Sequence, residues 1–104
     1  MPYEIRFAPE AVKDFQDLRA MVRAEVRDCV ERYLRYAPKT ISKSRIKRLR
    51  GLSRPQYRLR VKDDVRVFYD VTEDAVEILG IVQKSEALQW LQQFGEDDET
   101  SRPI

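Results

Sequence analysis

A basic stretch from Lys39 to Arg66 holds the residues whose types and spacing could do chemistry. Eleven lysines and arginines lie there against two acids, Asp63 and Asp64. The run Tyr57–Lys62 reads Tyr-Arg-Leu-Arg-Val-Lys, an alternation that places apolar side chains on one face of a strand and cations on the other. A row of cations on a rigid strand suits the binding of a polyanion, and RNA or DNA is the first candidate.

The next segment predicts a second strand that widens this cationic surface. Apolar residues at 65, 67, 69 and 71 alternate with Arg66, Phe68 and Asp70. If the apolar side of each strand faces the helices, Arg66 joins the cations on the open face, at Arg58, Arg60 and Lys62. Cross-strand neighbours lie about 5 Å apart, so the cluster would match one or two phosphates. The alternative is an ordinary solvated face, but solubility alone would mix acids among the cations, and the acids are missing.

The composition excludes several kinds of catalytic site. The chain has no histidine, which removes Ser-His-Asp triads, Cys-His pairs, HExxH zinc sites and histidine-based ribonuclease chemistry. Acid–base chemistry must therefore come from Lys, Tyr, Asp or Glu, or from a partner. The single cysteine, Cys29, cannot form an internal disulfide and fits a helix as a small buried hydrophobe. We expect no metal and no cofactor.

Length and charge predict one domain with an acidic end. The chain has 104 residues, enough for a single core, and we place the domain at residues 1–95. The net charge is +2, but residues 96–99 read Glu-Asp-Asp-Glu, and we expect residues 96–104 to form an acidic, disordered tail. No stretch has the pattern of a signal peptide or a membrane span, so a cytoplasmic location is expected.

Periodicity predicts the elements that must position the cations. We expect a strand at 3–7, a helix from Pro9, a second helix from Met21 to Ala37, and the start of a strand at 46–49. Strands at 56–62 and 65–71, joined by the two residues Asp63-Asp64, should precede an apolar strand at 75–82 and a helix from Ser85 to Gly95. The order β-α-α-β-β-β-β-α predicts an α+β fold in which two antiparallel helices pack on a largely antiparallel, twisted sheet.

Three sequence elements together resemble the RelE/ParE toxin superfamily of bacterial toxin–antitoxin modules. They are Phe-x-Pro-Glu-Ala-x-Lys-Asp at 7–14, Lys-Arg-Leu-Arg-Gly at 47–51, and Tyr-Arg-Leu-Arg-Val followed by Arg-Val-x-Tyr-x-Val over 57–71. The similarity runs from about Tyr3 to Leu91 and is strongest to the RelE branch. It implies a compact RelE-like small ribonuclease fold.

The resemblance also implies an activity and partners. RelE-type toxins enter the ribosomal A site and cut mRNA without a metal: the 2′-hydroxyl attacks the adjacent phosphate, and translation is inhibited. The implied partners are a cognate antitoxin protein and the ribosome with its mRNA and 16S rRNA. Operator DNA would be reached only through the antitoxin, and no membrane contact is implied.

Position by position, the resemblance assigns a catalytic set: Arg58, Arg60, Lys62, Arg66 and Lys84. The RelE branch often has lysines at the first two positions, and arginines at the other three. Arginine keeps its proton and binds phosphate in a bidentate manner, so Arg58 and Arg60 suit transition-state stabilisation. Lys62 or Lys84 is the better candidate for proton transfer.

Further candidates for RNA contact lie outside that set. The cations of the preceding segment could bind backbone phosphates of ribosomal RNA or could simply be solvated: Lys43, Arg45, Lys47, Arg48 and Arg50. Trp90 stands where the family has a tyrosine; it could stack on a base or could pack the last helix on the sheet.

Two other functions remain open. A ParE-like protein poisons DNA gyrase by binding and cuts nothing, so it would need neither the cation cluster nor Trp90 for bond cleavage. A catalytically degenerate member would bind only antitoxin or RNA.

Overall fold

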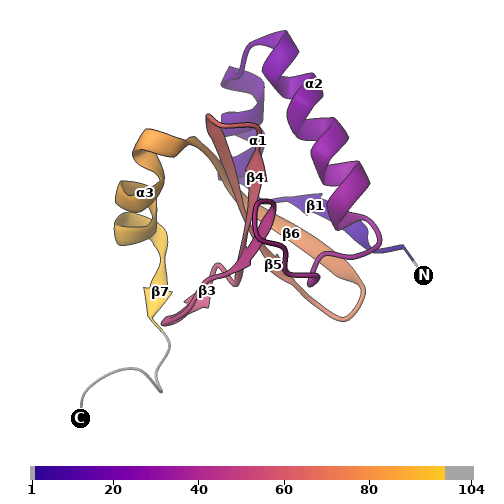
Figure 1. Ribbon diagram of the computed structural model, residues 1–104. Helices are drawn as coiled ribbons and strands as arrows, with labels where there is room; N and C mark the ends of the chain where they lie inside the picture. The colour runs from indigo at the N-terminus through magenta and orange to yellow at the C-terminus, as the bar shows by residue number, and fades with distance from the viewer. Residues whose placement is uncertain (1, 98–104) are drawn as a thin grey trace.

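The computed structural model describes residues 2–97, and its centre is a five-stranded sheet in the order β1-β6-β5-β4-β2 (Figure 1). β1 runs parallel to β6, and every other neighbouring pair in this sheet is antiparallel. The predicted α+β fold with a largely antiparallel sheet is confirmed. The strands of this sheet are β1 (Glu4–Phe7), β2 (Ile46–Arg48), β4 (Tyr57–Val61), β5 (Val65–Val71) and β6 (Ala75–Gln83).

The helices lie on both sides of this sheet. Figure 1 shows α1 (Pro9–Asp17) and α2 (Ala20–Cys29) on one side and α3 (Ala87–Phe94) on the other. The second helix was predicted as one run to Ala37; instead it widens into a π-helical segment, η1 (Val30–Leu34), which buries Val30 and Leu34. A short 3₁₀ turn, η2 (Lys84–Glu86), joins β6 to α3.

The core fills the space between the sheet and the first two helices. Leu59, Val67 and Ile81 form one row across β4, β5 and β6, and each is almost fully buried. Val26 and Leu34 cover them from the helices. Each aliphatic side chain of this size contributes about 1.5–3 kcal/mol when removed from water. The alternating apolar residues of the hairpin therefore fix which face of the sheet carries the helices.

The turn between β4 and β5 differs from the predicted two-residue link. Because Val61 pairs directly with Val65, the turn has three residues, 62–64, and β4 ends before Lys62. Lys62 takes a left-handed backbone conformation, with φ of 52°. Its side chain therefore leaves the alternation of the strand.

A small ribbon of two strands, absent from the prediction, fastens the end of α3. β3 (Leu52–Arg54) pairs antiparallel with β7 (Glu96–Asp97), and Ser53 Oγ donates to the carbonyls of Glu96 and Asp97. The expectation of a disordered tail from residue 96 is therefore wrong for Glu96 and Asp97. Residues 98–104 lie outside the described residues.

Ser42 closes the outer edge of β2. Its Oγ accepts the backbone N–H groups of Arg45 and Ile46, and its own N–H donates to the carbonyl of Ile46 at 3.0 Å. On the other side, β2 is paired with β4. Ser42 thus satisfies both outward backbone groups of Ile46 on the edge of β2 that does not face β4.

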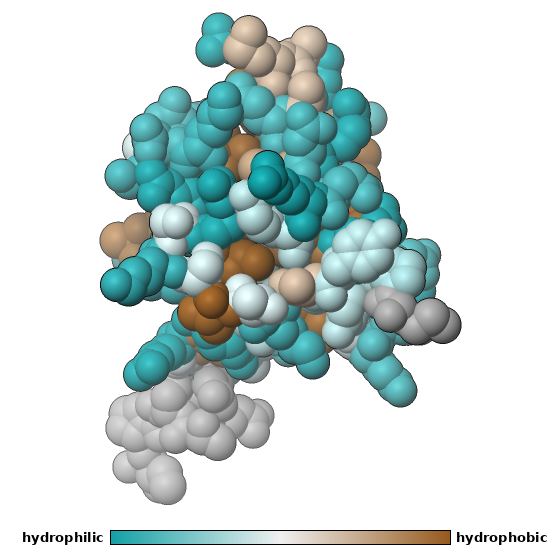
Figure 2. Space-filling model, turned by 45° about the vertical axis from the view of Figure 1, so that its right-hand side comes forward, coloured by the Kyte–Doolittle hydropathy of each residue, from teal (hydrophilic) through white to brown (hydrophobic). Residues whose placement is uncertain are grey.

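The surface is largely polar on the face in Figure 2, where hydrophilic residues dominate and apolar atoms appear as separate small patches. In the part of the chain that the structure describes, no helix is long and apolar enough to cross a membrane.

Candidate anion-binding site on the open face of the sheet

The register of the strands places three arginines together on the open face, the face opposite α1 and α2. Arg60 lies across from Arg66, which in turn lies across from Val82 of β6. In the next row, Arg58 lies across from Phe68. Cross-strand neighbours share a face and lie about 5 Å apart. We call Arg58, Arg60 and Arg66 the arginine cluster.

Arg66 is buried in this cluster with 6% of its surface exposed. Its Nη1 donates to the carbonyl oxygens of Lys62, Asp63 and Val65, at 3.5, 3.2 and 3.0 Å. Burial and then the charge of Arg60 lower the pKa of Arg66, and the charges of Asp63 and Asp64 oppose that shift. Within residues 2–97 it forms no ion pair, so its charge is held by backbone carbonyls of the turn.

Arg58 is the least satisfied member of the cluster. Its Nε is buried and has no hydrogen-bond partner among the described residues. Burial lowers its pKa first, and repulsion by Arg66 and Arg60 lowers it further. A lowered pKa means that the positive form is disfavoured here, so an incoming anion would relieve that cost.

Arg60 is the partly neutralised member. Its guanidinium pairs with the Asp63 carboxylate, and its Nε donates to the Lys62 carbonyl at 2.9 Å. Asp63 is highly exposed, with 84% of its side chain accessible. An exposed pair of this kind contributes at most about 1 kcal/mol, so Asp63 does not cancel the charge of the cluster.

Lys62 does not lie with the arginines, and the expectation that it shares their face is wrong. Its Nζ lies 3.5 Å from Glu25 Oε2 of α2, on the helix side of the sheet. The cause is the left-handed φ of Lys62, which ends the alternation one residue early. A role in proton transfer would require the amine to leave Glu25.

Lys84 is at the right end of the sheet for the predicted role. Its backbone N–H donates to the Asp64 carbonyl at 2.6 Å, which ties η2 to the turn that holds Arg66. Its side chain is exposed. Lys84 is therefore the lysine candidate beside the cluster.

Trp90 packs α3 onto the open face. Its ring stacks on Phe68 with centroids 4.8 Å apart and planes 10° apart, and it tilts against Phe94. A Cβ at Gly80 would come within 2.4 Å of the indole, so glycine is required for this approach. The packing interpretation accounts for the placement of Trp90. Its contact with a base stays a prediction.

The basic segment before the hairpin divides between the two faces. Lys47 is exposed across from Arg58 and extends the cluster, whereas Lys43 and Arg50 are exposed in loops. Arg45 and Arg48 instead lie over the rings of Tyr33 and Tyr57, at 4.9 and 5.2 Å from the ring centroids. RNA contact by these five residues remains a prediction.

Arg54 is a cation of the open face that the sequence analysis did not single out. Its guanidinium lies 2.8 Å from Glu77, 3.8 Å from Asp70 and 3.8 Å from Glu96. Asp70 is half-buried and accepts the N–H of Gln56; burial raises its pKa, and that hydrogen bond and Arg54 oppose the rise. The alternation of β5 and β6 could have placed Asp70 and Glu77 together, but nothing in the sequence brings Arg54 to them.

The arrangement suits anion binding more plainly than acid–base chemistry. Two of the three arginines carry a positive charge that no carboxylate within residues 2–97 pairs with. Tyr69 cannot serve as an acid from the other face: it is buried, its hydroxyl donates to the Pro38 carbonyl at 2.6 Å, and burial raises its pKa. Residues 2–97 contain no group of three metal-ligating side chains.

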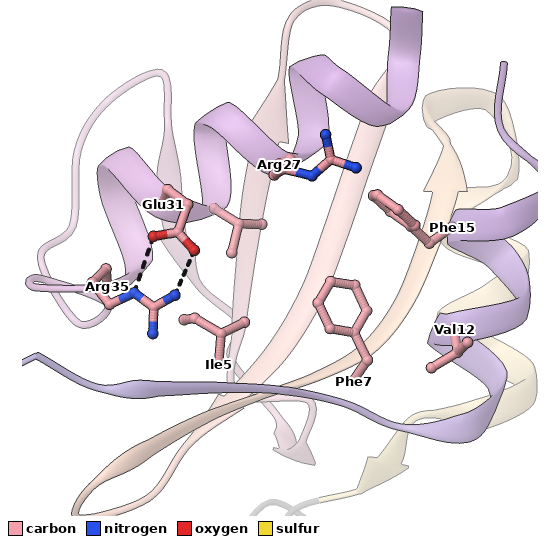
Figure 3. Close-up of a pocket in the computed structure, with 8 residues that line it drawn as sticks. Ile5, Phe7, Val12, Phe15, Arg27, Glu31 and Arg35 are labelled. Atoms are coloured by element: carbon pink, nitrogen blue, oxygen red, sulfur yellow. Dashed lines mark hydrogen bonds and ion pairs between the residues drawn. The ribbon is translucent and has the colours of Figure 1, made fainter. Parts of the chain in front are cut away.

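A groove lies on the helix side of the sheet, between β1, α1 and α2 (Figure 3). Its volume is about 390 Å³. Phe7, Val12 and Phe15 gather at one end, and the hydrogen-bonded pair Arg35–Glu31 closes the other. This groove is apolar at its Phe7 end and charged at its Glu31 end, and it lies away from the arginine cluster.

Comparison with known proteins now places this fold. Residues 5–88 match the family described as the ParE toxin of the type II toxin–antitoxin system, parDE. The chain belongs to the ParE toxin family. This confirms the RelE/ParE superfamily that the sequence motifs resemble. Comparison with curated protein sequences finds no match.

Solved structures of the superfamily share the fold. A mutant of the Escherichia coli toxin RelE in the free state matches with a TM-score of 0.67 and 18% identity, over 90% of this chain and 99% of that one. The RelE–RelB complex from Pyrococcus horikoshii matches with a TM-score of 0.59 and 27% identity, over 81% and 97%. The RelB–RelE antitoxin–toxin complex from Methanococcus jannaschii matches with a TM-score of 0.62 and 20% identity, over 82% and 96%. The chain is thus a ParE-family toxin with a RelE-like fold.

Proposed function

We propose that this toxin is a ribosome-dependent, metal-independent mRNA endoribonuclease that inhibits translation. The observation that carries the proposal is the arginine cluster, in which Arg58 and Arg66 are desolvated, repel each other and lack a carboxylate partner within residues 2–97. Such a cluster raises the free energy of the unbound toxin. A phosphate placed over it lowers that free energy through charge-assisted hydrogen bonds.

The proposed reaction assigns each side chain a task. The 2′-hydroxyl of RNA loses its proton and its oxygen attacks the adjacent phosphorus, while the bond from phosphorus to the 5′-oxygen breaks. The leaving 5′-oxygen takes up a proton, so the products are a 2′,3′-cyclic phosphate and a 5′-hydroxyl with no net gain or loss of protons. Arg58 and Arg66 stabilise the negative charge that grows on the equatorial oxygens. Lys84 is the group beside the cluster that could transfer a proton, and Lys47 extends the surface for the RNA backbone.

We further propose that a cognate antitoxin neutralises the toxin. Several solved structures of similar fold are toxin–antitoxin complexes. The apolar groove at Phe7, Val12 and Phe15 offers surface for such a partner, apart from the RNA site. Copurification of this toxin with the cognate antitoxin tests this proposal.

The decisive test is cell-free translation with purified toxin, followed by mapping of mRNA 5′ ends by primer extension. We expect cuts at A-site codons on translated message only. Replacing Arg66 and Lys84 together by alanine should abolish the cuts with the fold intact. A matched control replaces Lys13 and Arg19, two exposed cations of the α1 region, and should cut like the unmodified toxin. Full activity of the Arg66/Lys84 variant would refute the assignment.

A second candidate is a gyrase poison that cuts nothing. The match to the ParE model favours it, as does the diversion of Lys62 and Trp90 into packing and pairing roles. Intact mRNA together with inhibited DNA supercoiling would establish this alternative. Intact mRNA and normal supercoiling would leave the third reading, a member that only binds.

A further inference from the structure

The backbone carbonyl of Lys62 accepts hydrogen bonds from two members of the arginine cluster. Its carbonyl oxygen accepts Arg60 Nε at 2.9 Å and Arg66 Nη1 at 3.5 Å. The carbonyl of Asp63 accepts the same Nη1 at 3.2 Å. The turn 62–64 therefore orients two guanidinium groups, because both donate hydrogen bonds to its carbonyls.

The placement of these turn carbonyls depends on an unfavourable backbone conformation at Lys62. Lys62 is the one residue other than glycine with a positive φ among the described residues, at 52°. The left-handed region is sparsely populated by residues with a Cβ, because Cβ approaches the following carbonyl oxygen. Arg60 and Arg66 bond the carbonyls of Lys62 and Asp63, and the Lys84 N–H bonds the Asp64 carbonyl. These bonds hold the carbonyls of the turn, and a contact of the Lys62 side chain would add a further hold on its backbone conformation.

Glu25 supplies a hold on Lys62 itself. It lies on α2, is largely buried with 23% of its side chain exposed, and its carboxylate lies 3.5 Å from Lys62 Nζ. The helix is anchored in the core through Val26, the next residue, which is fully buried. Glu25 thus pulls the lysine side chain toward a rigid element on the far side of the sheet from the cluster.

We propose that Glu25 is a positioning residue for the proposed RNA site. Through its ion pair with Lys62 it holds the turn in the left-handed conformation, so that the turn carbonyls aim Arg60 and Arg66 at the phosphate. The part of this inference in which Arg60 and Arg66 bind an RNA phosphate rests on the proposed function. The part in which the Glu25–Lys62 ion pair holds the turn does not depend on it. The amine of Lys62 pairs with Glu25, and the carbonyl of Lys62 accepts hydrogen bonds from Arg60 and Arg66.

The test exploits glycine, which adopts a positive φ without steric cost. In full-length toxin, Glu25→Gln should weaken binding of a short single-stranded RNA at low salt about two- to fivefold, the range expected of an ion pair whose lysine is solvent-exposed. It should also speed solvent exchange of the Arg60 Nε proton, measured by NMR. Adding Lys62→Gly to Glu25→Gln should restore both quantities, whereas adding Lys62→Ala should not. Asp28→Asn, which removes another acid from α2, is the matched control and should change neither.

Each outcome decides one point. Unchanged proton exchange in Glu25→Gln would overturn the proposal, and so would equal defects in the glycine and alanine double variants, because the lysine amine itself would then be needed. The predicted exchange pattern in a toxin that binds no RNA would support the positioning role and overturn the proposed function. The two failures are therefore distinguishable.

Discussion

The two ends of the open face use arginine in opposite ways. At one end Arg54 lies among Asp70, Glu77 and Glu96 and fastens the β3–β7 ribbon to the sheet. At the other end Arg58 and Arg66 lie on the same face without a carboxylate partner within residues 2–97. Between them the stack of Trp90 on Phe68 separates the two environments.

The difference teaches how to tell a structural cation from a binding cation. A paired arginine has already exchanged water for carboxylates, so a new anion gains little there. An arginine held only by backbone carbonyls, or with a buried nitrogen left free, keeps most of its charge available. Residues of one type on one face can therefore be sorted by their partners.

The largest expected effect comes from removing an unpaired cation. Arg58→Met should weaken RNA binding and cleavage about 10- to 100-fold, because one charged hydrogen-bonding group to phosphate is worth about 1.5–3 kcal/mol. The same change should raise the free energy of unfolding by up to about 1 kcal/mol, since it removes a desolvated charge. Urea unfolding and an RNA titration measure the two. If Arg58→Met lost both stability and RNA binding, Arg58 would be a structural cation, which would contradict the distinction between paired and unpaired arginines.

A change at the boundary should affect stability strongly. Gly80→Ala should cost about 1–3 kcal/mol of unfolding free energy, because the new Cβ would meet the Trp90 ring at 2.4 Å. Differential scanning calorimetry and tryptophan fluorescence follow the loss. Combining Gly80→Ala with Trp90→Leu should lose less than the sum of the two single changes, and strict additivity would argue against the contact.

Removing Arg54, the paired arginine, should reduce stability and leave RNA cleavage intact, the opposite of what is expected for Arg58. Arg54→Ala should lower the unfolding free energy by about 1–2 kcal/mol, because it removes the cation that pairs with both the half-buried Asp70 and Glu77. The estimate is kept small because 45% of the Arg54 side chain is exposed. RNA cleavage should persist at temperatures where the variant is folded. Arg54→Lys is the conservative control, and a loss of cleavage without a loss of stability would refute the sorting.

The smallest effect should come from Asp70 and should depend on pH. Burial raises the folded-state pKa of Asp70, so ionisation is harder in the folded chain, and stability falls as pH rises from the unfolded pKa of about 3.9 through the higher folded pKa. Asp70→Asn keeps an acceptor for Gln56 and removes this loss. Its stability relative to the parent should rise by less than about 1 kcal/mol between pH 3 and 7, as measured by thermal unfolding. A relative fall would show that pairing with Arg54 outweighs burial.

Much of the fold could be predicted because alternation and helical periodicity are local properties of the sequence. The hairpin, the apolar β6 and the amphipathic helices follow from them, and so does the placement of Arg58, Arg60 and Arg66 on one face. The parallel pairing of β1 with β6 and the β3–β7 ribbon join residues far apart in the chain, which local patterns do not specify.

The site was predictable as far as the strand register extends. Lys62 was misplaced because its φ depends on where the turn begins, one residue earlier than the alternation suggests. The partners of Arg54 and the pull of Glu25 on Lys62 were not predictable, because they arise from elements that meet only in three dimensions.

Ser42 has a consequence for how free copies of this toxin meet one another. The outward N–H and C=O of Ile46 are already satisfied by one serine, so at this residue the edge of β2 offers no free backbone group to a strand from another molecule. A row of free backbone groups there would invite copies of the chain to stack edge to edge. The serine thereby disfavours edge-to-edge association of free copies of the chain.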